Sequence, residues 1–107
     1  MLQVKVYHTP KHLFRDVSMC FDEAKLKAFF DKNFTLYNHV ADVECVSMDM
    51  AFQFTNTIHQ AWWENEEVTT KFEGDGCRST SVGDLFIVGE KSFLVAHVGF
   101  VCIKGEE

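Results

Sequence analysis

The first eight residues alternate between aliphatic and other side chains. In LQVKVYH, residues 2–8, every second side chain up to Val6 is aliphatic. This period of two predicts a strand with one buried face. We expect Thr9-Pro10 to end the strand, because proline cannot donate a hydrogen bond to a neighbouring strand. Residues 11–19 fit neither the period of a strand nor that of a helix.

The spacing of apolar residues then changes to that of a helix. Asp22 and Glu23 place acids where the first turn is expected, and the helix dipole favours negative charge there. Good helix formers follow in AKLKAFF, and the helix is expected to end before Asn33. The broad apolar face of this predicted helix consists of Phe21, Ala24, Leu26, Ala28, Phe29 and Phe30.

Alternation returns between Tyr37 and Val46 and predicts a second strand, of the antiparallel kind that has one wet side. Val40 and Val46 depart from the alternation. Ser47 is predicted to cap a second helix over MDMAFQFTNTI, residues 48–58, because its hydroxyl can accept from an unpaired backbone N–H. One face of the strand is expected to carry Tyr37, His39, Ala41, Val43 and Cys45.

Regular patterning is lost between residues 62 and 80. The acidic run ENEE and the turn-forming EGDG, residues 73–76, predict a solvated loop. The chain after residue 84 is strongly apolar and predicts further strands, with a tight turn at residues 89–91. We expect Gly99 to mark a bulge in a strand that continues. The expected strands cover residues 85–88, 93–98 and 100–103.

The order strand, helix, strand, helix, loop and strands predicts an α+β fold. A chain of 107 residues can bury one core, so we expect a small single domain over residues 1–107. Hydrophobic residues make up 47% of the chain, which is typical of a folded protein. The expected architecture is a curved, mainly antiparallel sheet with two helices.

The net charge limits the expected partners, and the cysteines indicate the compartment. The formal net charge is −6, from 16 acids against 10 basic residues that are scattered along the chain, which disfavours nucleic acid as the main partner. An acidic surface can instead meet a basic host protein. No apolar run reaches the length of a membrane span, so no membrane partner is expected. Four cysteines without a C-x-x-C pair, and no secretory signal pattern, predict reduced thiols in the cytoplasm.

None of the familiar catalytic or cofactor motifs is complete. His8 and His12 are four residues apart, but Pro10 lies between them, so they do not fit a helical metal site. A serine, Asp84 and a distant histidine could be drawn as a triad, yet the G-x-S-x-G turn is missing. The glycine-rich motifs that hold phosphates are missing as well. We therefore expect no cofactor and no metal, and nothing in the sequence requires catalysis.

What remains is a polar and aromatic set that could form a binding surface. Trp and Arg are frequent interface anchors, since they offer large area or a rigid fork of donors. A structural interpretation stays open, in which one of two adjacent Trp rings is buried and Arg78 pairs with Asp84 to hold a turn. The candidate binding residues are Asn56, Trp62, Trp63, Asn65, Arg78, Ser79, Thr80, Ser81 and Asp84.

Three short motifs stand in a fixed order along the chain. They are A-F-x-x-T-N at 51–56, W-W-x-N at 62–65 and R-S-T-S-V-G-D-L at 78–85, followed by V-G-F near the end. This combination resembles short uncharacterised proteins of phages and phage-like mobile elements. The serine-rich lead into an aspartate and an apolar strand is also similar to YodL-like domains of conjugative elements. The resemblance covers about residues 40–103.

The resemblance implies a setting more than an activity. Such proteins are made inside an infected bacterium, where small domains commonly bind host factors or block host defences. We therefore expect a non-enzymatic cytoplasmic protein that binds a host protein through its Trp and Arg surface and the acidic loop, residues 64–76.

A second hypothesis stays open from the residues alone. Arg78 could hold an anion while Ser79, Thr80, Ser81 and Asn56 read polar groups of a small molecule or nucleotide, with or without catalysis. Association between copies of the chain is possible too, because a strand at an exposed sheet edge can pair with another.

Overall fold

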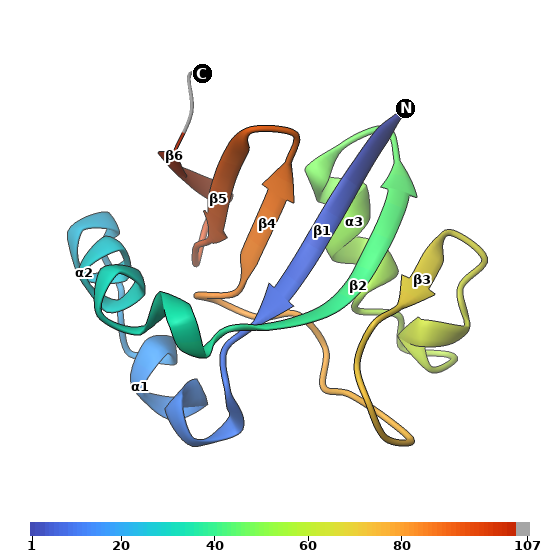
Figure 1. Cartoon of the computed structure of the whole chain (residues 1–107), viewed down its shortest axis with the longest axis horizontal. Coiled ribbons are helices and arrows are strands. Elements are labelled where there is room, and N and C mark those ends of the chain that lie inside the picture. The colour runs from blue at the N-terminus through green and yellow to red at the C-terminus, as the bar shows by residue number, and fades with distance from the viewer. Residues whose placement is uncertain (105–107) are drawn as a thin grey trace.

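One antiparallel sheet organises the chain (Figure 1). The computed structural model describes residues 1–104, and within them six strands lie in the order β3-β2-β1-β4-β5-β6. Every neighbouring pair is antiparallel, which confirms the predicted α+β fold class. The strands are β1 (Leu2–His8), β2 (Asn38–Cys45), β3 (Val68–Thr70), β4 (Leu85–Val88), β5 (Lys91–Val95) and β6 (Phe100–Lys104).

The two predicted helices are present. The second begins at the predicted cap, Ser47, whereas Asp22, predicted as an acid of the first turn, is itself the cap of the first. The Asp22 carboxylate accepts from the backbone N–H of Lys25 at 2.8 Å, and the Ser47 hydroxyl accepts from that of Met50 at 3.2 Å. A further short helix, α1, occupies the stretch that fitted neither period. The helices are η1 (Lys11–Leu13), α1 (Phe14–Ser18), α2 (Glu23–Asn33), η2 (Phe34–Leu36), α3 (Met48–Phe54) and η3 (Trp62–Glu64).

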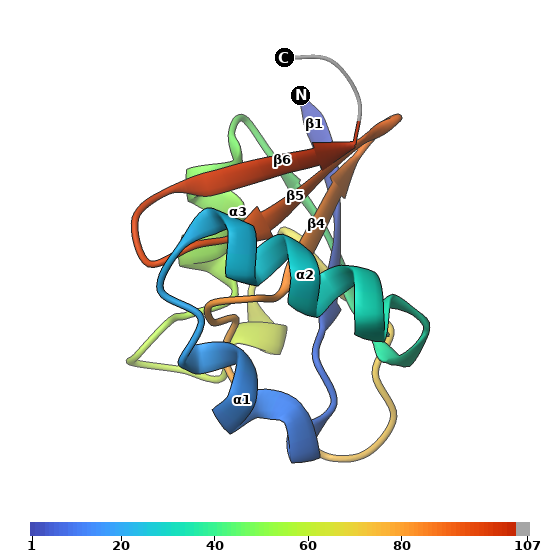
Figure 2. The ribbon, with the colours of Figure 1, turned by 90° about the vertical axis from the view of Figure 1, so that its left-hand side faces the viewer.

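The two longer helices cover opposite faces of the sheet. Figure 1 shows α3 behind β1 and β2, while Figure 2 shows α2 beside the half of the sheet that contains β4, β5 and β6. Successive side chains of a strand point to opposite faces, so each face has its own apolar cluster. Val4, Val6 and Phe86 pack with Ala51 of α3. On the other face, Leu85 and Leu94 pack with Leu26 of α2.

A bulge in β2 changes which side chains of the second strand share a face. Val6 pairs with Ala41, but the next residue, Tyr7, pairs with His39, so Val40 is the extra residue. An extra residue reverses the alternation along a strand. Tyr37 therefore packs with the α2 cluster, and the His39 ring stacks on Tyr7 at 4.7 Å. The expectation that both share a face with Ala41 was wrong.

Two further expectations about strands were wrong. Residues 68–70, predicted as loop, form β3, which pairs with β2 through the backbone and carries little apolar side chain to reveal it. Gly99 does not bend a continuing strand. It has φ +71°, and the Ala96 N–H donates to its carbonyl at 3.0 Å, so the chain reverses there between β5 and β6.

The helices also differ in detail from the patterns that predicted them. Ala24 and Ala28 of α2 are exposed, and Phe21 lies before the helix, where its ring stacks on His97 at 4.7 Å. Only Leu26 of the predicted apolar face is fully buried, while Phe29 and Phe30 are half-buried. The third helix ends at Phe54 instead of residue 58.

Candidate functional site

The polar segment 77–84 packs against the end of β1, and Asp84 is its centre. The Asp84 side chain is fully buried and accepts four hydrogen bonds. The donors are the backbone N–H of Thr9 at 2.9 Å, the backbone N–H of Ser81 at 2.8 Å, and both terminal nitrogens of Arg78 at 2.7 and 2.8 Å. A buried carboxylate is stable only when its oxygens are saturated in this way.

Arg78 is engaged in internal contacts on every side. Besides Asp84, its guanidinium donates to the hydroxyl and carbonyl oxygens of Thr9 at 2.9 and 3.2 Å, and to the Ser79 carbonyl at 3.0 Å. It also lies over the Phe14 ring, 4.6 Å from its centre. These contacts agree with the structural interpretation that the sequence left open, in which Arg78 pairs with Asp84 to hold a turn. The guanidinium is already neutralised, so it is a poor anchor for an anion.

His8 joins the same network from β1. Its Nε2 lies 3.0 Å from the Thr80 hydroxyl and 3.7 Å from Asp84 Oδ2, and its Nδ1 lies 3.5 Å from the Cys77 sulfur. Burial lowers the pKa of His8 to about 4, against the opposing effect of Asp84, so the ring is neutral at neutral pH. Burial also raises the pKa of the Cys77 thiol.

Trp62 supports this segment from the core side. Its ring is only 2% exposed, and its indole N–H donates to the carbonyl oxygens of Cys77 at 3.1 Å and Arg78 at 3.0 Å. Trp63 is half-buried and packs edge-on against Trp62 and Phe72. Trp62 is therefore a core residue and cannot be an exposed anchor.

The remaining candidates join the loops to α3. The Asn56 amide donates to the Phe52 carbonyl at 2.9 Å, and the Asn65 amide to the Phe54 carbonyl at 2.7 Å. Both bonds satisfy carbonyl groups at the helix C-terminus, which have no partner within the helix. Thr80 is buried and Ser81 half-buried, whereas the Ser79 side chain is exposed.

The structure therefore brings Arg78, Thr80, Ser81 and Asp84 together in one hydrogen-bond network. Asn56 and Asn65 lie outside it and hydrogen-bond to the C-terminal end of α3. Sequence reasoning missed His8 and Cys77 as members of that network. They are 69 residues apart along the chain, and no motif connects them. The only available signal was the C-R-S-T-S sequence itself, in which Cys77 directly precedes the polar run.

Two surface hollows meet at Cys77. The first has a volume of about 490 Å³ and is bordered by His8, Lys11, Asn38, Cys77 and other residues, none of them acidic. The second, of about 570 Å³, shares Lys11, Asn38 and Cys77 and extends to Lys71 and Glu73. The thiol is half-buried, and the hollows give it access to solvent.

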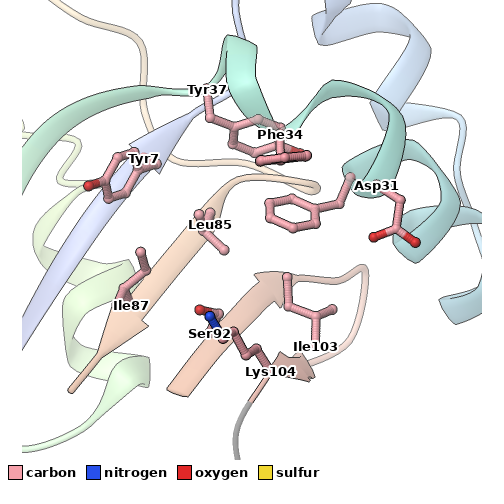
Figure 3. A pocket seen from close by; sticks show the side chains of 10 residues that line it. Tyr7, Asp31, Phe34, Tyr37, Leu85, Ile87, Ser92, Ile103 and Lys104 are labelled. Carbon is pink, nitrogen blue, oxygen red and sulfur yellow. The ribbon is translucent and has the colours of Figure 1, made fainter. Parts of the chain in front are cut away.

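A separate, more apolar pocket of about 510 Å³ lies on the α2 side of the sheet (Figure 3). Tyr7, Leu85 and Ile103 contribute from the sheet, and Phe30 and Phe34 from the end of α2 and from η2. The side chains of Asp31 and Lys104 also line it. Sequence reasoning missed this pocket, because its residues come from six separate elements.

A third hollow, which we name the acidic groove, lies where β2 ends beside α3. Met50 and Phe54, one turn apart on α3, form its apolar part together with Val46, Cys45 and the side chain of Met1, and Glu44, Glu66 and Glu67 complete its lining. Its volume is about 390 Å³. The Glu44 N–H donates to the Glu67 carbonyl at 3.0 Å, which holds two of the acids beside each other. Among the described residues, none of these three carboxylates forms an ion pair.

Other classes of site were sought across residues 1–104. No set of three or more His, Cys, Asp or Glu side chains in that range is placed to hold a metal ion. No helix there combines the length and apolar character that crossing a bilayer requires. No disulfide joins the four cysteines. Comparisons with protein-family models, with curated proteins and with solved structures find no match for this chain.

Proposed function

We propose that the chain is an interaction domain that binds a basic, partly apolar segment of another protein in the acidic groove. The observation that carries the proposal is the combination of Met50, Phe54 and Val46 with three carboxylates that form no ion pair within residues 1–104. The resemblance to phage proteins supports a host protein of the infected bacterium as the source of that segment.

The charge of the groove specifies the partner. Three carboxylates held around one hollow repel each other, and a partner cation relieves this repulsion. The whole chain adds to the effect, because its formal net charge is −6. Lysine or arginine side chains of the partner are therefore expected to face Glu44, Glu66 and Glu67.

The apolar part of the groove specifies the rest of the segment. Val46 is 66% exposed, and it lines the groove together with Met50. Methionine is flexible and polarisable and adapts to varied apolar partners. An amphipathic segment, with apolar residues toward Met50 and basic residues toward the acids, satisfies both parts of the groove.

The proposed surface differs from the one that the sequence indicated. Trp62 is buried and Arg78 is internally paired, so neither can anchor a partner. The acidic loop, residues 64–76, contributes through Glu66 and Glu67. The proposal therefore keeps the acidic loop from the sequence and replaces the Trp and Arg surface by Met50, Phe54 and Val46.

Affinity purification from bacterial lysate tests this function. We expect the tagged chain to retain a partner that Glu67→Lys and Met50→Asp each weaken, and that high salt releases. Glu90→Lys is the matched control, because Glu90 is an exposed acid in the β4–β5 turn and the substitution changes net charge equally. A partner that survives Glu67→Lys, or that Glu90→Lys weakens as much, contradicts the proposal.

The pocket in Figure 3 supports a second candidate function, the binding of a small amphipathic molecule. An apolar lining with a few polar groups is typical of ligand pockets of this volume. Leu85 and Ile103 would contact the apolar body, and Asp31 or Lys104 a charged end. Thermal-shift screening of metabolites, with Leu85→Phe to fill the pocket, distinguishes this candidate, since Leu85→Phe leaves the acidic groove unchanged.

A further inference from the structure

We propose that Cys77 is a nucleophile that His8 activates, and that the hollow in front of it accepts an ester or thioester with an anionic acyl group. This site is separate from the acidic groove, and the inference does not depend on the proposed function. It rests on two observations. The His8 ring contacts the Cys77 thiol, the Thr80 hydroxyl and the buried Asp84 carboxylate, and His8 and Cys77 both line one hollow.

The geometry gives each nitrogen of His8 a defined role. The negative charge of Asp84, 3.7 Å from Nε2, favours a proton on that nitrogen, which can then donate to Thr80 Oγ1 at 3.0 Å. Nδ1 is left with its lone pair, and it lies 3.5 Å from the Cys77 sulfur. A nucleophile beside a base that a third group orients is the recurring arrangement of covalent catalysis.

The rest of the polar network fixes this arrangement. Asp84 cannot rotate away from His8, because Arg78 and the backbone N–H groups of Thr9 and Ser81 hold both of its oxygens. Trp62 binds the carbonyl oxygens of Cys77 and Arg78 and so fixes the backbone that carries the thiol. Asp84 and Arg78 are positioning residues, since they act through His8 and Cys77.

The surroundings of the thiol indicate the charge of the substrate. Lys11 borders both hollows that meet at Cys77, and the first hollow has no acidic residue in its lining. Most of this chain is acidic, with a formal net charge of −6, so a hollow lined only by basic and neutral groups is distinctive. A carboxylate on the acyl group would lie toward Lys11.

The reaction balances without any cofactor. The Cys77 sulfur attacks the carbonyl carbon while its proton moves to Nδ1 of His8, so a C–S bond forms. The bond to the leaving oxygen or sulfur breaks with its electron pair, and the leaving group takes the proton from His8. Water then attacks the acyl-Cys77 thioester, gives its proton to His8 and releases a carboxylic acid, and the proton returns to the Cys77 sulfur.

Burial disfavours a resting thiolate–imidazolium pair between Cys77 and His8. Burial raises the pKa of Cys77 and lowers the pKa of His8, so both groups are neutral at rest. The proton therefore has to move during the attack. Asp84 then stabilises the imidazolium that forms, while the charge of Arg78 opposes it.

Alkylation by iodoacetate and iodoacetamide, followed by mass spectrometry of each cysteine peptide, tests the inference. Cys20 is the internal control, because it is also half-buried but its thiol faces the Asp16 carbonyl at 3.7 Å. We expect iodoacetamide to react with Cys77 about 10-fold faster than with Cys20, and His8→Gln to remove that excess. Iodoacetate should favour Cys77 over Cys20 more strongly still, and Lys11→Ala should remove this preference for the anion.

The acyl step has its own readout. The mono-p-nitrophenyl ester of succinate should release p-nitrophenol and leave a succinyl group on Cys77, and Cys77→Ser should show neither. Equal alkylation of Cys77 and Cys20 in the unmodified chain would overturn the inference and leave a structural role for the pair. If His8→Gln does not fold, Lys11→Ala still decides the result, because Lys11 is exposed and an unchanged preference for iodoacetate contradicts the proposed hollow.

Discussion

At the scale of single residues, the segment C-R-S-T-S-V-G-D is explained by one buried carboxylate. Asp84 accepts hydrogen bonds from Arg78 and Ser81 of its own segment and from Thr9, which directly follows β1, and it lies beside His8. The side chains of Arg78, Thr80 and Asp84 therefore all have hydrogen-bond partners within this network. The Ser79 side chain is exposed.

Replacing Arg78 should destabilise the fold strongly. Arg78→Ala leaves the carboxylate of Asp84 buried without its cation, which we expect to lower the free energy of unfolding by about 3 kcal/mol. Arg15→Ala is the control, because Arg15 is exposed and forms no ion pair within residues 1–104. Urea unfolding at neutral pH measures both. Similar losses for the two variants would contradict the role given to Arg78.

The pKa of His8 predicts how stability depends on pH. The folded-state pKa of about 4 lies below the unfolded value of 6.5, so the unfolded chain binds more protons between these pH values. Stability should therefore fall as pH drops from 6.5 to 4, with about 3 kcal/mol as the full contribution of this group. In His8→Gln the free energy of unfolding should change less over the same window. Equal pH dependence in both proteins would show that His8 is not buried in its neutral form.

The sequence predicted some of these residue contacts and could not predict others. Arg78 and Asp84 are six residues apart, so a turn that pairs them was foreseeable. The contacts of His8 with Cys77 and Thr80 span 69 and 72 residues and depend on β1 lying beside β4. No local pattern records such a pairing.

At the scale of elements, the sequence predicted those features that depend on neighbouring residues alone. The cap at Ser47 and the acid Asp22 at the start of α2 were predicted from single side chains, and β1 from its alternation. The bulge at Val40 was visible only as an exception to the alternation, and its effect on His39 and Tyr37 required the register with β1. The strand β3 was missed because its stability comes from backbone pairing with β2.

Gly83 combines a left-handed backbone conformation with close packing against Val17 of α1. It has φ +89°, and an added Cβ would collide with Val17 of α1, with two of the Val17 carbons at 3.1 Å and a third closer. We expect Gly83→Ala to cost about 3 kcal/mol, from overpacking as well as from the strained φ. Gly74→Ala is the matched control, because Gly74 has φ +101° with open space around it, and it should cost about 1 kcal/mol.

The denaturant midpoints of Gly83→Ala and Gly74→Ala measure the two losses of stability. A loss for Gly83→Ala no larger than that for Gly74→Ala would mean that α1 moves freely away from the sheet. Val17→Ala in the Gly83→Ala background should recover part of the loss, because it removes the carbons that the new methyl group meets.

At the scale of the whole molecule, the fold separates its possible sites by the faces and ends of one sheet. The pocket in Figure 3 lies on the α2 side, and the acidic groove lies beside α3. The radius of gyration is 12.9 Å, close to the value of about 13 Å for a compact chain of this length. Fold class followed from the order of elements in the sequence. The pocket and the hollows did not, because each draws its lining from distant parts of the chain. That residues 1–107 form one domain stays a prediction.

The central claim is that Met50 lies at the surface where the partner binds. Methyl NMR of the chain with ¹³C-labelled methionine tests it most directly, because Met19, 63% exposed and located at the end of α1, is an internal control in the same spectrum. On addition of the captured partner, or of a basic amphipathic peptide derived from it, the Met50 methyl resonance should shift and that of Met19 should stay in place. A bound partner that shifts Met19 and leaves Met50 unchanged would contradict the account.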